Sequence, residues 1–256
     1  MGEMQMPANE EQHIAIAEEK LRRFLALADD VLALRTQIQR QLDQQVRHLS
    51  HTLRNRVLVA LYLKTLDSFD RLIVDAREKR SECSHHLKTM AESFIYSGWV
   101  GKDQGDTRAK LLLADGYRSK VVYYGLVEEQ ELAAQWGSLQ SQVLEGIRTE
   151  WKDFHRSSLE QIADEGNRSD HYRQVYRLAC EAAHLGDLFM YMPPQPEGQG
   201  IGFSDQSMMS AYVCLKFGII LACDMLHDAT DSLGVHFDAQ LEDFRGRWRA
   251  IIDLHP

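Results

Sequence analysis

An arginine and a histidine, Arg177 and His184, lie seven residues apart in the stretch YRLACEAAHLGD (Tyr176 to Asp187). An α-helix has about 3.6 residues per turn, so this spacing places both side chains and Glu181 on one helical face. Histidine can transfer a proton near neutral pH, and arginine can hold a phosphate through paired N–H donors. The three alanines between them allow a second helix or a substrate to approach closely. We therefore take Arg177, Glu181 and His184 as the candidate catalytic residues.

The same spacing also permits a purely structural role. Glu181 follows Arg177 by four residues, the separation at which a carboxylate and a guanidinium pair along a helix. Such a pair would form a polar seam inside a helical bundle. Arg173 lies about one turn before Arg177 on the same helical face. This face could therefore present two cations to a nucleic-acid backbone. The spacing alone supports either interpretation.

A second cluster, in the stretch DMLHDATD, is a candidate metal site. Three aspartates and a histidine recur there at helical spacing: Asp224, His227, Asp228 and Asp231. Carboxylates and imidazole are ligands for divalent cations, and the His–Asp pair is similar to the HD signature of metal phosphohydrolases. That signature needs further ligands on both sides, whereas only 28 residues follow Asp228. The alternative is the polar end of a helix.

The stretch SHHLKTMAES contains a third group of polar residues. His85 and His86 are adjacent, so on a helix they point in different directions and form a poor joint ligand set. Lys88 and Glu92 are four residues apart and are predicted to form an ion pair. We interpret this group as structural.

Composition and the remaining motifs narrow the function. Of the 256 residues, 44% are apolar and 26% charged, with a net charge of −9, which argues against a general nucleic-acid coat or a membrane-surface protein. The four cysteines form no CxxC pair, which favours free thiols in a reducing cytoplasm. No Gly-rich phosphate loop or GxSxG elbow is present. We expect neither a cofactor nor a membrane partner, and the apolar window Ala211 to Cys223, which contains Lys216, is read as a buried helix.

Helical periodicity extends through most of the chain. Apolar residues recur every three or four positions from residue 14 to 49 and again in successive stripes from residue 58 to 154. No long alternating strand pattern appears. The predicted fold is all-α: a helical bundle (residues 51–256) preceded by a long, coiled-coil-like N-terminal helical arm (residues 1–50). An isolated arm would expose its apolar seam, which motivates the prediction of a homo-oligomer.

From about residue 50 to 235, the order of motifs resembles a family of uncharacterised all-helical bacterial proteins. The resemblance is carried by LKTMAESFIYSGWV, GKDQGD, LADGYRSKVVYY and YRLACEAAHLGD. It implies an arginine where this chain has Lys88, followed by the glutamate matched by Glu92. It also implies a serine where this chain has Cys180. The family brings no activity with it.

The spacing of Arg177 and His184 is also similar to that of the HEPN superfamily, helical proteins of which many are metal-independent ribonucleases in toxin and antiviral systems. This resemblance implies that two chains pair their motif helices into one site. It implies that His184 moves the proton of an RNA 2′-hydroxyl and that Arg177 stabilises the charge on phosphorus. Leu178 and Glu181 depart from the pattern, because those nucleases tend to have a polar residue after the arginine and because a carboxylate repels phosphate.

Three functions follow from these observations. The leading one is a HEPN-like, metal-independent endoribonuclease in a defence or toxin–antitoxin context, with RNA and a second copy of the chain as partners. The second is a non-catalytic helical scaffold or regulatory protein with a protein partner. The third is a metal-binding helical protein.

Overall fold

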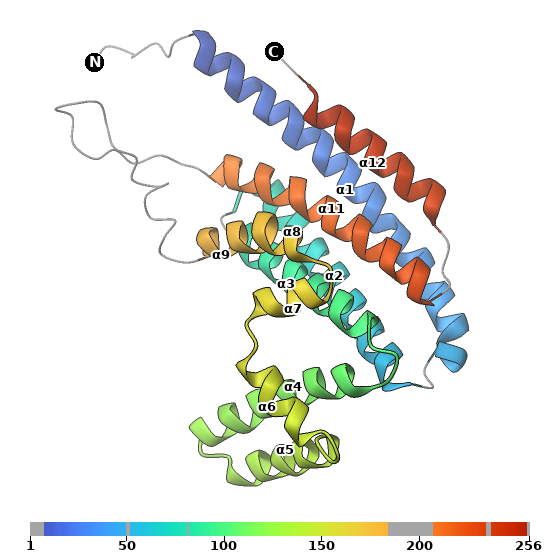
Figure 1. Ribbon diagram of the computed structural model, residues 1–256. Coiled ribbons are helices and arrows are strands. Elements are labelled where there is room, and N and C mark those ends of the chain that lie inside the picture. Colours follow the sequence, from blue (N-terminus) through green and yellow to red (C-terminus); the bar gives the residue numbers. More distant parts are fainter. Residues whose placement is uncertain (1–7, 50–51, 81, 184–206, 234–236, 255–256) are drawn as a thin grey trace, which may run out of the picture.

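The protein is a bundle of helices (Figure 1). The computed structural model describes residues 8–49, 52–80, 82–183, 207–233 and 237–254, and every regular element in these ranges is a helix. The elements are α1 (Ala8–Leu49), α2 (Leu53–Arg77), α3 (Cys83–Gly101), α4 (Thr107–Leu126), α5 (Gln130–Val143), α6 (Arg148–Arg156), α7 (Leu159–Glu165), α8 (Ser169–His171), the π-helix η1 (Tyr172–Tyr176), α9 (Arg177–Ala183), α11 (Ser207–Leu233) and α12 (Asp238–Ile252). The all-α prediction is confirmed.

Helix α11 forms the centre of the bundle, against α1, α2, α3 and α12. Its residues Leu215, Ile219 and Ala222 are fully buried. Gly218 allows α2 to come close, because a Cβ at this position would lie 3.2 Å from Leu72 Cδ1. Since burying a leucine or isoleucine contributes about 1.5–3 kcal/mol, α11 supplies much of the hydrophobic stabilisation.

One segment of α11 is apolar enough to raise the question of a membrane span. Among the described residues, Ser210–Ala229 is long and apolar enough to cross a membrane, and 56% of its apolar window is buried inside the protein. The core helix of a soluble bundle can have the same length and composition. The burial agrees with the expectation of a buried helix here.

The first part of α1 belongs to the same core. Phe24, Leu27 and Val31 are fully buried, and the helix lies along α11 and α12 (Figure 1). Over residues 21–34 the apolar stripe is therefore covered by the chain's own helices. The homo-oligomer prediction loses its premise over this stretch, and the division at residue 50 stays a prediction.

Helices α4 and α5 form a hairpin that lies at one end of the bundle (Figure 1). Helix α4 buries only three residues and α5 none. The hairpin therefore leaves large apolar side chains exposed, among them Val122, Tyr123 and Leu126. The stripe expected to run on to residue 154 is broken after α5, where Gly146 adopts a φ of +79° that favours glycine.

Candidate functional site

The candidate motif lies at the end of a helical stretch that changes its winding. Helix α8 continues through the π-helix η1 into α9, so the wider π turn comes directly before Arg177. π-Helical turns are rare and frequently mark functional sites. The rings of Tyr172 and Tyr176 stack at the two ends of this turn, with centroids 5.4 Å apart.

Tyr176, the last residue of η1, holds the start of α9 against α3. The pKa of Tyr176 is raised well above its ordinary value, first by burial and then by a hydrogen bond to Cys180. The nearby Glu92 carboxylate raises it further, and the Tyr176 hydroxyl also donates to this carboxylate. The phenol therefore stays protonated and acts as a donor. The predicted ion pair between Lys88 and Glu92 is not found among the described contacts, and Glu92 contacts Tyr176 instead.

Residues from three separate motifs meet at this point. Burial, together with the negative charges of Asp115 on α4 and Glu92 on α3, raises the pKa of Tyr96 to about 12. We call Glu92, Tyr96, Asp115, Tyr176 and Cys180 the Glu92 cluster. Within it the Tyr176 hydroxyl hydrogen-bonds to Glu92 and Cys180, whereas Asp115 and Glu92 act on Tyr96 through their negative charge. Such an arrangement can orient a helix. Sequence reasoning assigned no role to Tyr96 or Asp115, although both lie in motifs that carried the family resemblance.

The outer face of α9 points to solvent. Arg177 and Glu181 are both exposed, and so is Arg173 one turn earlier. The described residues make no ion pair between Arg177 and Glu181, so the salt-bridged seam is not observed in this part of the chain. His184 lies outside the described residues. The structure therefore presents Arg177 as a surface cation and leaves its pairing with His184 as a prediction.

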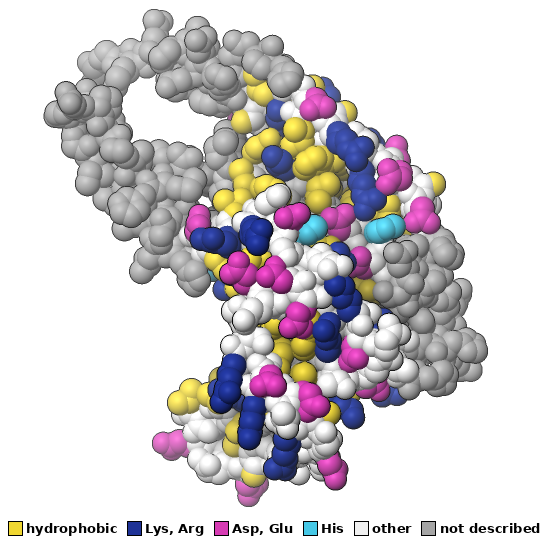
Figure 2. All heavy atoms as spheres, viewed as in Figure 1, with side chains coloured by type: hydrophobic (Ala, Val, Ile, Leu, Met, Phe, Trp, Pro, Cys, Tyr) yellow, Lys and Arg dark blue, Asp and Glu magenta, His cyan; other side chains and the backbone are white. Residues whose placement is uncertain are grey.

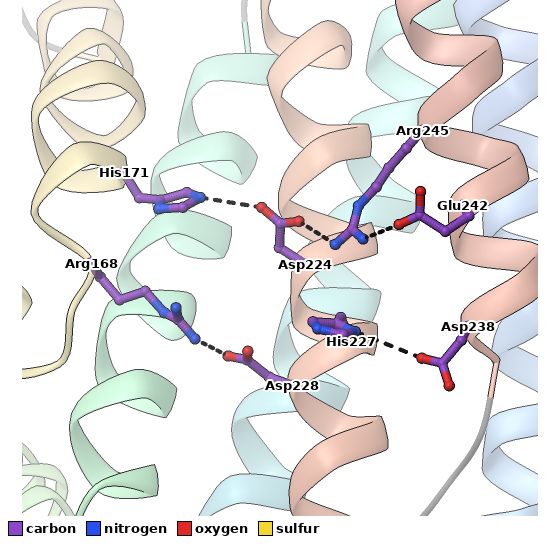
Figure 3. Close-up of polar contacts among 8 residues, drawn as sticks. All are labelled: Arg168, His171, Asp224, His227, Asp228, Asp238, Glu242 and Arg245. Atoms are coloured by element: carbon purple, nitrogen blue, oxygen red, sulfur yellow. Dashed lines mark hydrogen bonds and ion pairs between the residues drawn. The ribbon is translucent and has the colours of Figure 1, made fainter.

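A polar network anchors the start of this helical stretch to the centre of the bundle (Figure 3). Asp224 on α11 accepts from Arg245 of α12 at 3.0 Å and lies 3.2 Å from His171 Nε2. Arg168, just before α8, donates to Asp228. Burial by itself would raise the pKa of Asp224, but the hydrogen bonds from His171 and Arg245 outweigh it and hold that pKa below its ordinary value. For Asp228 burial prevails over Arg168, and the pKa is raised.

This network uses the residues of the candidate metal site. Arg245 of α12 pairs with Asp224, Arg168 pairs with Asp228, and His227 Nδ1 lies 3.8 Å from Asp238 (Figure 3). The side chain of Asp231 lies outside the described residues. Among the residues that the structure does describe, no three His, Cys, Asp or Glu side chains form a group able to hold a metal ion. The metal-binding alternative therefore gains no support here.

Two glycines bring α3 against the turn that precedes the motif. A Cβ on Gly98 would lie 2.9 Å from the carbonyl oxygen of Gly166, and a Cβ on Gly166 would lie 2.9 Å from the backbone nitrogen of Trp99. Real Cβ atoms do not come this close, so both positions exclude larger side chains. The guanidinium of Arg168 lies over the ring of Phe94, 4.3 Å from its centroid. These contacts fix the direction in which the motif helix leaves α7.

The adjacent histidines of α3 differ in their contacts but lie beside the same groove. His86 Nε2 lies 3.0 Å from Asp75 Oδ2 of α2. His85 is exposed, and both histidines line the same groove of 630 Å³ between α2 and α3. The interpretation of this group as structural stays a prediction.

The sequence profile of a protein family of unknown function (DUF5677) matches residues 55–193. This match covers more than half of the chain, so the protein belongs to that family, and the predicted relationship to an uncharacterised all-helical family is confirmed. No curated protein and no solved structure matches the chain. The matched residues include the Glu92 cluster, Arg177 and His184.

Proposed function

We propose that this member of the DUF5677 family is a HEPN-like, metal-independent endoribonuclease. The observation that carries the proposal is the position of Arg177, which is exposed on α9 and has no ion-pair partner among the described residues. A free guanidinium can form two parallel hydrogen bonds with the oxygens of a phosphate. Figure 2 shows acidic and basic side chains interspersed on one face of the bundle. Arg173 and Arg177 are both exposed about one turn apart, and two neighbouring cations attract a phosphate backbone locally.

The reaction that fits these residues needs no metal. The RNA 2′-oxygen attacks the adjacent phosphorus, the bond to the 5′-oxygen breaks, and a 2′,3′-cyclic phosphate forms. In this proposal His184 accepts the 2′-hydroxyl proton, Arg177 stabilises the additional negative charge on the phosphoryl oxygens, and a proton from solvent completes the 5′-hydroxyl. Glu181, exposed on the same face, places a carboxylate beside this site and is a departure from the superfamily pattern. As the superfamily resemblance implies, two chains would supply one site.

The anchored side of the helix supports this role. The Glu92 cluster holds Tyr176 and Cys180 against α3, while Arg168 and His171 tie the preceding turn to α11. A catalytic cation has to be held in a fixed direction, and these contacts restrain the helix that bears it. None of them consumes Arg177 itself.

Cleavage of single-stranded RNA in the presence of EDTA tests the proposal. We expect the wild-type protein to cleave, and Arg177→Ala and His184→Ala to lose at least about 100-fold of the rate, the range typical for loss of a catalytic acid, base or charge-stabilising group. Arg249→Ala, a change of an exposed arginine on α12, is the matched control and should retain activity. Equal cleavage by all four proteins would identify a contaminating nuclease and refute the proposal.

A second function, that of an interaction protein, is favoured by the α4–α5 hairpin. Its exposed apolar side chains, including Tyr123, Leu126 and Leu132, are of the type that partner proteins cover. Under this alternative, Leu126→Glu abolishes partner binding, whereas Arg177→Ala changes no activity. Light scattering of Leu126→Glu beside the wild type measures self-association. A fall in mass identifies a second copy of the chain as the partner, and an unchanged mass identifies a different protein.

A further inference from the structure

We propose that a groove between α2, α4 and α5 binds an amphipathic carboxylate with an acyl-like apolar body. The groove has a volume of about 390 Å³, near the lower end of the 300–1,000 Å³ typical of small-molecule sites. Aliphatic side chains such as Leu61 and Leu112 form its walls, and Trp136 of α5 lies against it. This inference does not rest on the proposed nuclease activity, because Arg177 and the Glu92 cluster do not line the groove.

Two lysines give the groove its preference for an anion. Lys64 of α2 and Lys120 of α4 both line it, both are exposed, and no acidic side chain of the described residues is part of its lining. Neither ammonium group has an ion-pair partner in the described part of the chain. An apolar slot with unpaired cations on two of its helices suits a molecule with an apolar body and one negatively charged head.

A glycine in the middle of α4 adds to the space in the groove. Gly116 lines the groove, and a Cβ placed on it would meet no atom within 4 Å. Glycine inside a helix is destabilising relative to alanine. Tight packing accounts for glycine at positions 98 and 218, whereas a Cβ at Gly116 meets no atom, as is also the case at Gly101, Gly125 and Gly246; of these open positions, only Gly116 lines the groove. The missing side chain instead leaves space inside the groove.

Calorimetric titration with three ten-carbon compounds tests the head-group preference: decanoate, decanol and decyltrimethylammonium, each below its micelle concentration. We expect decanoate to bind at least tenfold more tightly than decanol, and the cation not to bind. Shortening the chain from ten to eight carbons should weaken binding about fourfold per methylene, which corresponds to 0.8 kcal/mol. Equal affinities for the three head groups would overturn the proposal.

Variants then locate the site. Lys64→Gln combined with Lys120→Gln should weaken decanoate at least tenfold and leave decanol unchanged, whereas Lys152→Gln on α6 should have no effect. Gly116→Leu should fill the groove and abolish binding. Its matched control is Gly125→Leu in the same helix, where a Cβ also meets no atom but which does not line the groove.

A localisation that needs no variant keeps the test decisive if Gly116→Leu does not fold. In ¹⁵N-labelled wild-type protein, decanoate should shift the amide signals of residues 57–64 and 112–120. Shifts confined to another region, or unchanged binding in a folded Gly116→Leu protein, would refute the groove as the site.

Discussion

The two glycines Gly98 and Gly116 offer a sharp test, because the same substitution in two helices should have opposite effects. Gly98→Ala and Gly116→Ala both improve helix propensity by about 0.5–1 kcal/mol. At position 116 the new methyl group meets no atom within 4 Å, so this gain should appear as added stability. The local sequence gives no reason for the two sites to differ.

At position 98 the surroundings reverse the sign. The new Cβ would lie 2.9 Å from the Gly166 carbonyl oxygen and 2.8 Å from Arg168 Nε. The arginine can rotate away, but it would then leave Asp228, and the carbonyl belongs to a backbone turn that can move only with α7. Overpacking of this kind costs about 1–3 kcal/mol after relaxation. We therefore expect Gly98→Ala to lower the free energy of unfolding by about 1–2 kcal/mol, allowing for the propensity gain.

Urea denaturation followed by circular dichroism measures both changes. For a chain of this size, 1 kcal/mol corresponds to a shift in Tm of about 2–4 °C, so thermal melts should separate the two variants clearly. Because Gly98 lies against the turn that directs α9, the variant should, under the proposed nuclease function, also lose RNA cleavage before it loses helicity. If Gly98→Ala proves as stable as Gly116→Ala, the close contact between α3 and the α7–α8 turn is wrong.

Three further predictions concern individual polar groups. Because the folded-state pKa of Asp224 is lowered, the ionised carboxylate stabilises the fold above the ordinary aspartate pKa, and this stabilisation is lost as pH falls through the lower folded value. Asp224→Asn should therefore be less stable than the wild type at pH 7 and lose less stability on acidification below about pH 4. A thiol reagent at pH 8 should modify half-buried Cys180 before Cys83 and Cys223, because burial raises the pKa of Cys83 and raises that of Cys223 to about 12. Peptide mapping that finds Cys83 or Cys223 labelled first would contradict this prediction. Tyr176→Phe should lower the free energy of unfolding by about 1 kcal/mol through the lost hydrogen bond. Under the proposed nuclease function it should also reduce RNA cleavage in a protein that still melts cooperatively, and unchanged cleavage would show that the hydroxyl does not position α9.

The helical elements follow from the sequence because their signal is local. Apolar residues at three- and four-residue spacing predict α1, α2, α3 and α11, since each helix must turn one stripe toward other apolar surface. The same reasoning marks the buried character of Ala211 to Cys223. The π turn at Tyr172–Tyr176 and the break at Gly146 have no comparable pattern, because each depends on packing around it.

The motif residues were also identifiable from the sequence, but their partners were not. Helical spacing places Arg177 and Glu181 on one face, and both are found on one exposed face. Spacing also allows them to pair, and only the structure determines that Glu181 leaves Arg177 without this partner. Similarly, Lys88 and Glu92 have ideal spacing for an ion pair. Glu92 instead contacts Tyr176, which lies more than 80 residues later in the chain.

The sequence by itself therefore determined the helical class, the family and the residues whose side chains could take part in catalysis or binding. Tertiary structure decided which of those residues are consumed by contacts: Asp224 and Asp228 are engaged by arginines of other segments, whereas Arg177 faces solvent. The physical reason is that a helix stripe depends on neighbours three or four residues apart, whereas the pairing of a charge depends on groups that only packing brings within hydrogen-bonding distance.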